Sequence, residues 1–151
     1  HALRDRWGFP GMRVLQFAFG DQSLENPHKP HNFVRNCIVY TGTHDNETTA
    51  GWFRQRTGEP ARSEIELALR YMGTDGTDAV WDLIRLAVSS VADIAILPMQ
   101  DVVGLGTEAR MNIPSTVENN WRWRMTEGQI HSELAGKLRD MNYIYGRWRT
   151  S

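Results

Sequence analysis

Short runs of β-branched and aliphatic residues alternate along the chain with longer segments in which apolar side chains recur every three or four positions. The runs predict buried strands and the spaced segments predict amphipathic helices. We expect strands at residues 13–19, 37–43 and 93–97. Helices are expected at residues 48–56, 61–72, 78–91 and 127–145, and residues 2–7 are typical of the end of a further helix. The polar, Pro-rich residues 21–36 and most of residues 104–123 are expected to be irregular.

Strands separated by helical connections predict an α/β fold. Three such strands fit part of an α/β barrel better than a complete doubly wound sheet, although the pattern alone does not decide between them. The sequence contains no repeat, no low-complexity tract and no domain-scale linker. A chain of 151 residues is long enough for one domain.

Three adjacent polar side chains directly follow the strand expected at residues 37–43: His44, Asp45 and Asn46. In barrels and open α/β sheets, ligands bind at the carboxyl ends of the strands. The pattern therefore indicates an active-site strand end. The alternative is a polar turn in which Asp45 or Asn46 caps the next helix.

The charge balance and the single cysteine limit the classes of function. With 17 Lys+Arg against 18 Asp+Glu, the chain has no basic field for a nucleic acid or a membrane surface, so a neutral substrate is more natural. No apolar stretch approaches the roughly 20 residues that a membrane span needs. Cys37 is the only cysteine, which excludes a disulfide within the chain, and its apolar setting favours a small buried hydrophobe over a nucleophile.

Five motifs give the sequence a family resemblance. They read GFPGMRVLQFAF, HKPHNF, THDNETTAGW, RMNIP and NWRWR and lie at residues 8–19, 28–33, 43–52, 110–114 and 120–124. In this order and spacing they resemble the C-terminal part of a 4-α-glucanotransferase, the amylomaltase or disproportionating-enzyme family of the α-amylase clan. The resemblance covers essentially the whole chain.

The resemblance implies that residues 1–151 form part of a catalytic (β/α)8 TIM barrel, namely about its sixth to eighth strands with the closing helices. The chain starts with His1 rather than Met, and we expect it to be a piece of a longer protein whose N-terminal part is missing. In the family, the aspartate nucleophile and the glutamate acid/base lie on earlier strands. We therefore expect the chain to be inactive alone, to need that N-terminal part, and to expose two sheet edges and a core face.

The activity implied by the resemblance is the transfer of an α-1,4-glucan segment to the 4-hydroxyl of another glucan or of glucose, with retention, through a covalent glycosyl-enzyme. Asp45 matches the family's transition-state stabiliser, and His44 matches the histidine that donates to the same sugar. The expected partners are maltooligosaccharides, amylose and glycogen. No cofactor and no metal are implied.

Further substrate contacts are expected from residues spread over the chain: Phe19, Asn46, Asn112 and Pro114. Phe19 follows the first expected strand and offers an aromatic face for a sugar, whereas Asn112 and Pro114 match an Asn-x-Pro loop of the family. For Trp121 and Trp123, packing of a C-terminal loop is favoured over stacking on a sugar. We expect a cytoplasmic protein, or a plastid protein if the source is a plant.

Two rival interpretations remain open. A metal-dependent barrel hydrolase could gather ligands from His28, His31, His44 and Asp45, but their spacing matches no established metal motif. A non-catalytic carbohydrate-binding fragment is the second rival, because it would need neither nucleophile nor acid/base. Metal content and a glucan-binding test distinguish the three.

Overall fold

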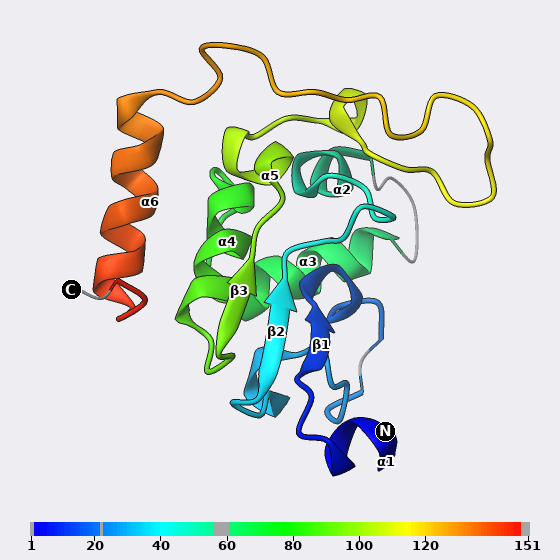
Figure 1. Ribbon diagram of the computed structural model, residues 1–151, viewed down its shortest axis with the longest axis vertical. Helices are drawn as coiled ribbons and strands as arrows, with labels where there is room; N and C mark the ends of the chain where they lie inside the picture. Colours follow the sequence, from blue (N-terminus) through cyan, green and yellow to red (C-terminus); the bar gives the residue numbers. More distant parts are fainter. Residues whose placement is uncertain (1, 22, 56–60, 149–151) are drawn as a thin grey trace.

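Three parallel strands form the sheet in the computed structural model, which describes residues 2–21, 23–55 and 61–148. The strands are β1 (Gly11–Val14), β2 (Cys37–Tyr40) and β3 (Ile94–Ile96), and they lie in the order β1-β2-β3. Met12, Ile38 and Ile94 are register partners. All three expected strands are therefore present, in the parallel arrangement that an α/β fold requires (Figure 1).

Helices occupy the connections and the two ends of the chain (Figure 1). Their bounds are α1 (Ala2–Arg6), α2 (Thr49–Gln55), α3 (Ala61–Met72), α4 (Ala79–Ser89), α5 (Met99–Val103) and α6 (Ser132–Ile144), and short 3-10 turns lie at Leu15–Phe17, Pro30–Asn32 and Thr107–Ala109. The bounds predicted for α3 are confirmed, whereas Arg56, the predicted last residue of α2, lies outside the described residues. Within the described part of the chain, no helix has the length and apolar character of a membrane span.

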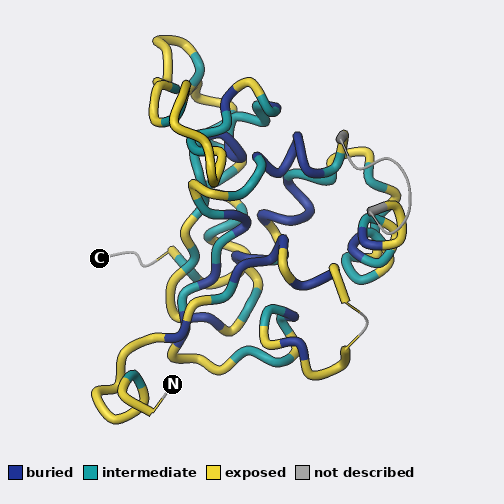
Figure 2. Tube along the Cα trace, turned by 90° about the vertical axis from the view of Figure 1, so that its right-hand side faces the viewer, coloured by how far each residue is buried: buried dark blue, intermediate teal, exposed yellow. Residues whose placement is uncertain are grey.

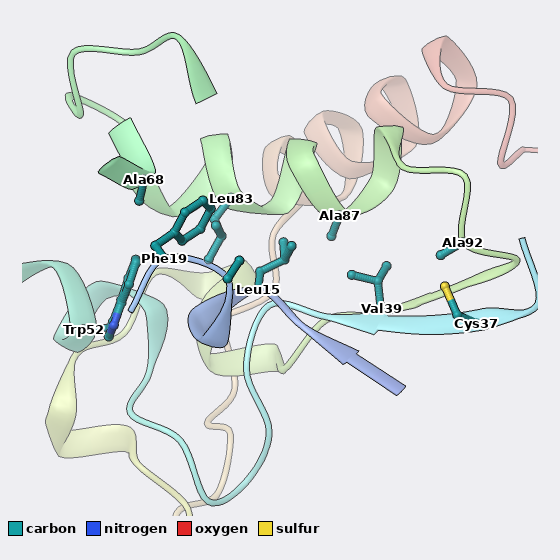
Figure 3. Packing of buried hydrophobic residues seen from close by; sticks show 10 residues of the cluster. Leu15, Phe19, Cys37, Val39, Trp52, Ala68, Leu83, Ala87 and Ala92 are labelled. Atoms are coloured by element: carbon teal, nitrogen blue, oxygen red, sulfur yellow. The ribbon is translucent and has the colours of Figure 1, made fainter. Parts of the chain in front are cut away.

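The hydrophobic core lies between one face of the sheet and helices α2 to α4. Its buried side chains come from both layers (Figure 3): Leu15, Phe19, Cys37, Val39, Trp52, Ala68, Leu83, Ala87 and Ala92. Cys37 is fully buried among them and its thiol is free, as expected of a small hydrophobe. Because the burial involves every layer, the core holds β2 against the helices that follow it.

The opposite face of the sheet is open. Met12, Ile94 and Ile96 are 51%, 48% and 42% exposed, and no described helix covers them. Figure 2 shows the buried positions gathered in the interior of the molecule. An apolar sheet face of this kind is what the sequence predicts for part of a barrel.

The first strand is shorter than predicted. It ends at Val14, whose backbone N–H donates to His28 Nδ1 at 2.9 Å, and the chain then enters the 3-10 turn Leu15–Phe17. The carbonyl oxygen of Phe17 accepts from Asn26 Nδ2 at 2.9 Å. Side chains of the 21–36 loop thus pair with backbone groups of β1 and of the turn that follows it.

The pH dependence of stability is expected to reveal the His28 contact. Burial, together with the nearby positive charge of Arg13, lowers the pKa of His28 against the opposing effect of Asp21. The unfolded chain then binds more protons, so this contribution to stability is complete above the unfolded pKa of about 6.5 and falls as the pH drops through it. Urea unfolding at about pH 7.5 and about pH 5.5 measures this effect. The free energy of unfolding should fall less between the two pH values for His28→Asn than for the unchanged protein.

A matched control for this test is His131→Asn, because His131 Nδ1 also accepts a backbone N–H, that of Leu134, at 3.3 Å. This control measures how the exchange of a histidine for an asparagine by itself changes the pH dependence of stability. An identical pH slope for His28→Asn and the unchanged protein would contradict the role assigned to His28.

Two helix boundaries also differ from the prediction. Helix α4 ends at Ser89, so Val91 is 52% exposed instead of continuing the apolar stripe, and Ser90 donates its hydroxyl to the Ala87 carbonyl. Helix α6 begins only at Ser132 because His131 is its N-cap. Leu134, Leu138 and Met141 of this helix pack against a cluster that contains Trp81.

Candidate active site

The turn after β2 is shaped by the side chain of Asn46. Its amide oxygen accepts from the backbone N–H of Thr43 at 2.9 Å and from the Thr43 hydroxyl at 2.7 Å. Asp45 N–H reaches the same hydroxyl at 3.3 Å. The turn therefore closes on itself and presents His44 and Asp45, two exposed side chains, at the carboxyl end of the strand.

The helix-cap alternative is wrong for Asp45 and Asn46. The first turn of α2 is capped by Thr48, whose hydroxyl accepts from Gly51 N–H at 3.1 Å, and by Asp101 of α5, which accepts from Thr49 N–H at 2.7 Å. Asp101 also accepts from the Thr41 hydroxyl at 2.5 Å, and it is 1% exposed. Burial raises the pKa of Asp101, and the Thr41 and Thr49 hydrogen bonds oppose this rise. Asp101 thus ties the end of β2 to the start of α2.

His44 and Asp45 lie side by side. The distance from His44 Nε2 to Asp45 Oδ1 is 3.3 Å, and the two side chains are 54% and 52% exposed. The His44 ring also packs against the Trp121 ring, with the centroids 4.9 Å apart. Trp121 therefore packs the C-terminal loop onto the site, as the sequence predicts. Trp121 itself is still 53% exposed.

A segment far along the chain brings Asn112 to this pair. Residues 110–124, which we call the strap, pass beyond the ends of the strands to which the arrows in Figure 1 point. Asn112 Nδ2 donates to Asp45 Oδ1 at 2.6 Å, and Asn112 N–H donates to the His44 carbonyl at 3.1 Å. The structure therefore joins three of the residues predicted from the sequence: His44, Asp45 and Asn112.

The remaining predicted residues lie further out or deeper. Pro114 is exposed in the strap, next to Ser115, whose φ of 65° lies in the left-handed region that glycine favours. Phe19 is only 2% exposed and packs against Trp52 and Tyr71, with ring centroids 6.3 and 5.6 Å apart. The structure therefore shows the Phe19 ring as part of the core. Its contact with a glucan stays a prediction.

Arg110 and Glu47 belong to the site although neither was predicted. Arg110 Nη1 lies 3.3 Å from Glu47 Oε2, and Arg110 Nη2 donates to the Asp45 carbonyl at 2.9 Å. Both residues fall within motifs that carry the family resemblance, and that was the available signal. Their pairing was not predictable, because 63 residues of sequence separate them.

Two hollows flank the turn. One of about 160 Å³ is lined by His44, Arg110 and Trp121 among others, and the second of about 360 Å³ is lined by Asp45, Glu47 and Arg110 among others. The second has mainly polar walls. A ligand with several hydroxyl groups could therefore meet hydrogen-bonding partners on the side of the turn where Asp45 lies.

The metal ligands suggested by the rival interpretation lie apart. His28 accepts from Val14, His31 Nδ1 lies 2.9 Å from the Tyr71 hydroxyl, and His44 pairs with Asp45. Within residues 2–21, 23–55 and 61–148, no group of three or more His, Cys, Asp or Glu residues has an arrangement that could hold a metal ion.

Comparison with known sequences gives consistent matches. Residues 1–130 match the family model described as 4-α-glucanotransferase. The 4-α-glucanotransferases of Synechocystis and of Clostridium butyricum are 47% and 48% identical over 97% and 96% of this chain. The chloroplastic/amyloplastic enzyme of Solanum tuberosum is 50% identical over 96% of it. The chain spans between a quarter and 29% of the length of these relatives.

Comparison with solved structures agrees. An amylomaltase from Streptococcus agalactiae in complex with acarbose superposes with a TM-score of 0.89 at 34% sequence identity. The match covers 98% of this chain and 29% of that one. By sequence and by structure, the chain belongs to the 4-α-glucanotransferase family.

Proposed function

We propose that this chain is the C-terminal part of the catalytic (β/α)8 barrel of a 4-α-glucanotransferase, in which β1, β2 and β3 are the sixth, seventh and eighth strands. Two observations support this assignment. The chain matches 29% of a solved amylomaltase, and its sheet has one open apolar face of the kind that the rest of a barrel would cover. The nucleophile and the acid/base then lie in the N-terminal part of the enzyme.

The proposed reaction cleaves an α-1,4 bond of a donor glucan and passes the glycosyl group, held on the nucleophile, to the 4-hydroxyl of an acceptor glucan or of glucose. Two inversions give net retention. The transition state resembles an oxocarbenium ion, so its positive charge is stabilised by a carboxylate that is already in place.

The geometry of Asp45 is the observation that carries this proposal. The carboxylate is half exposed at the end of β2, and its Oδ1 is held by Asn112 and lies near His44. No described residue hydrogen-bonds Oδ2. Asp45 can therefore bind sugar hydroxyls through Oδ2 while the protein fixes the orientation of the group, and bonds that strengthen in the transition state accelerate the reaction.

His44 is assigned the donation of a hydrogen bond to the same sugar. Asn112 and Asn46 orient Asp45 from the strap and from within the turn, and Pro114 and Phe19 are the further proposed substrate contacts. The proposed substrates are maltooligosaccharides, amylose and glycogen, and no cofactor is required. The proposed substrate class agrees with the acarbose bound to the Streptococcus agalactiae amylomaltase. We propose a cytoplasmic location, or a plastid location if the source is a plant, as the name of the Solanum tuberosum relative says of that enzyme.

The test is an assay of the full-length enzyme that carries this chain, with maltotriose as the only substrate. Glucose and longer maltooligosaccharides should appear together, and a metal chelator should leave their rate unchanged. Maltose and glucose without longer products would show a hydrolase and contradict the proposal. Activity that a chelator removes would favour the metal-dependent alternative.

A further inference from the structure

We propose that Arg110 is the positioning residue that holds the Asp45 carboxylate in its reactive orientation. The inference rests on the proposed function of Asp45 and adds the element that makes the site rigid. The Arg110 guanidinium contacts groups of the protein, so we assign it a role through Asp45 and not in the making or breaking of the glycosidic bond. Its role is to lock the turn after β2 to the strap.

Three nitrogens of the Arg110 guanidinium contact three acceptors in two segments. Nε donates to the Asn112 carbonyl at 2.9 Å, Nη2 donates to the Asp45 carbonyl at 2.9 Å, and Nη1 lies 3.3 Å from Glu47 Oε2. The first acceptor belongs to the strap and the other two belong to the turn. The guanidinium therefore fixes the distance between Asn112 and Asp45, the two residues joined by the 2.6 Å hydrogen bond to the carboxylate.

Only arginine supplies this geometry. Its planar group presents several donors in a rigid fork, whereas lysine has one compact ammonium group that cannot reach three separated acceptors in the same way. The Arg110 and Glu47 side chains are 22% and 13% exposed, so their ion pair is shielded from much of the solvent. Shielding strengthens the pair relative to an exposed one.

Glu47 is itself firmly anchored. Its carbonyl accepts from Gln16 Nε2 at 2.9 Å, and its Oε1 accepts from Thr48 N–H at 3.0 Å. Oε1 also lies where Gly51 leaves room for it, because a Cβ on that residue would lie 2.6 Å from this atom. The anchor of Arg110 is thus attached to the core turn after β1 and to the start of α2, and movement of the strap is resisted by both.

The strap needs such a brace. Three of its residues other than glycine have positive φ angles, namely Ser115, Asn119 and Trp121. These conformations are unfavourable for side-chain-bearing residues and persist only where the surroundings hold them. Residues 113–119 are exposed along their whole length (Figure 2), so the contacts that hold the strap on the site are concentrated at its two ends, near Arg110 and Trp121.

The test is a double-mutant comparison in the full-length enzyme. Arg110→Met retains an unbranched side chain but removes all three polar contacts, and a small misplacement of a catalytic group can cost on the order of a hundredfold in rate. We expect kcat to fall about 10- to 100-fold and KM to change by less than about threefold. Arg110→Lys should lower kcat by nearly the same factor. Arg62→Met removes an exposed arginine that pairs with Glu66 and should keep the kcat of the unchanged enzyme.

The decisive readout is the same substitution in an Asp45→Ala background. If Arg110 acts through Asp45, Arg110→Met should lower kcat no further once that carboxylate is gone. An equal loss in both backgrounds would show a merely structural role and overturn the inference. Should Arg110→Met fail to fold, Glu47→Gln loosens the same guanidinium while keeping side-chain size, and its kcat loss should likewise vanish in the Asp45→Ala background.

The proposed function and the positioning role of Arg110 are tested by different outcomes. If the full-length enzyme without any substitution lacked transferase activity, the proposed function would be contradicted. An active enzyme whose kcat is unaffected by Arg110→Met would leave that function intact and overturn the positioning role alone.

Discussion

Asp45→Asn in the full-length enzyme is expected to lower kcat by at least about a hundredfold, the scale of losing one preorganised electrostatic group. The substitution keeps the size of the side chain and an oxygen that can accept from Asn112, so the turn should keep its shape. It removes the negative charge that favours a cationic transition state. Because the ground-state sugar is neutral, KM should change much less than kcat.

Steady-state kinetics on maltotriose, with the melting temperature of each variant, measure this effect. Asp78→Asn is the matched control, since Asp78 is another exposed aspartate, paired with Lys137 at 2.8 Å on a different part of the surface. Its kcat should equal that of the unchanged enzyme. An unchanged kcat for Asp45→Asn would mean that the carboxylate only helps to shape the turn.

The part of the site that the sequence predicts is the part built by neighbours in the chain. His44, Asp45 and Asn46 follow an apolar run directly, so the end of β2 and the exposure of the polar residues could be inferred from the local pattern. The structural role of Asn46 as the acceptor that closes the turn was not inferred. It depends on the backbone angles of four residues, which the hydrophobic pattern does not encode.

Contacts across long separations could not be derived from the pattern. Asn112 was expected near the substrate from the family resemblance, but its bond to Asp45 spans 67 residues and starts from an irregular segment. Periodicity carries no information about where such a segment crosses the sheet. The same holds for Arg110 with Glu47 and for Asp101 with Thr49.

Phe19 shows how the length of a predicted strand affects the surroundings expected of a residue. A strand over residues 13–19 would have placed Phe19 at its carboxyl end, beside the substrate. The strand ends at Val14 and a 3-10 turn follows, which redirects the chain and buries the Phe19 ring against Trp52 and Tyr71. Side chains of the 21–36 loop, among them His28 with Val14, contact the backbone where this change of direction occurs.

The second large effect is expected from the chain studied alone, which should not disproportionate maltotriose. Asp45 can stabilise a transition state only where other residues make and break the glycosidic bond, and the proposed assignment places those residues in the N-terminal part of the enzyme. The open face of the sheet adds a second obstacle. Met12, Ile94 and Ile96 remain about half exposed, so the isolated chain is expected to self-associate or to unfold with low cooperativity.

Size-exclusion chromatography and thermal unfolding check the folding half of this prediction. A monodisperse monomer with a cooperative transition well above about 65 °C would contradict it and favour a self-contained domain.

Replacing a segment of a related enzyme with this chain tests whether Asp45 acts in the transfer reaction. The chain would replace the matching segment of the Clostridium butyricum 4-α-glucanotransferase, which is 48% identical to it, and maltotriose turnover would be compared for the chain alone, the joined protein and the joined protein with Asp45→Ala. The proposed function predicts no turnover by the chain alone, transfer products from the joined protein, and their loss with Asp45→Ala. Turnover by the chain alone, or a folded joined protein whose activity is insensitive to Asp45→Ala, would contradict it.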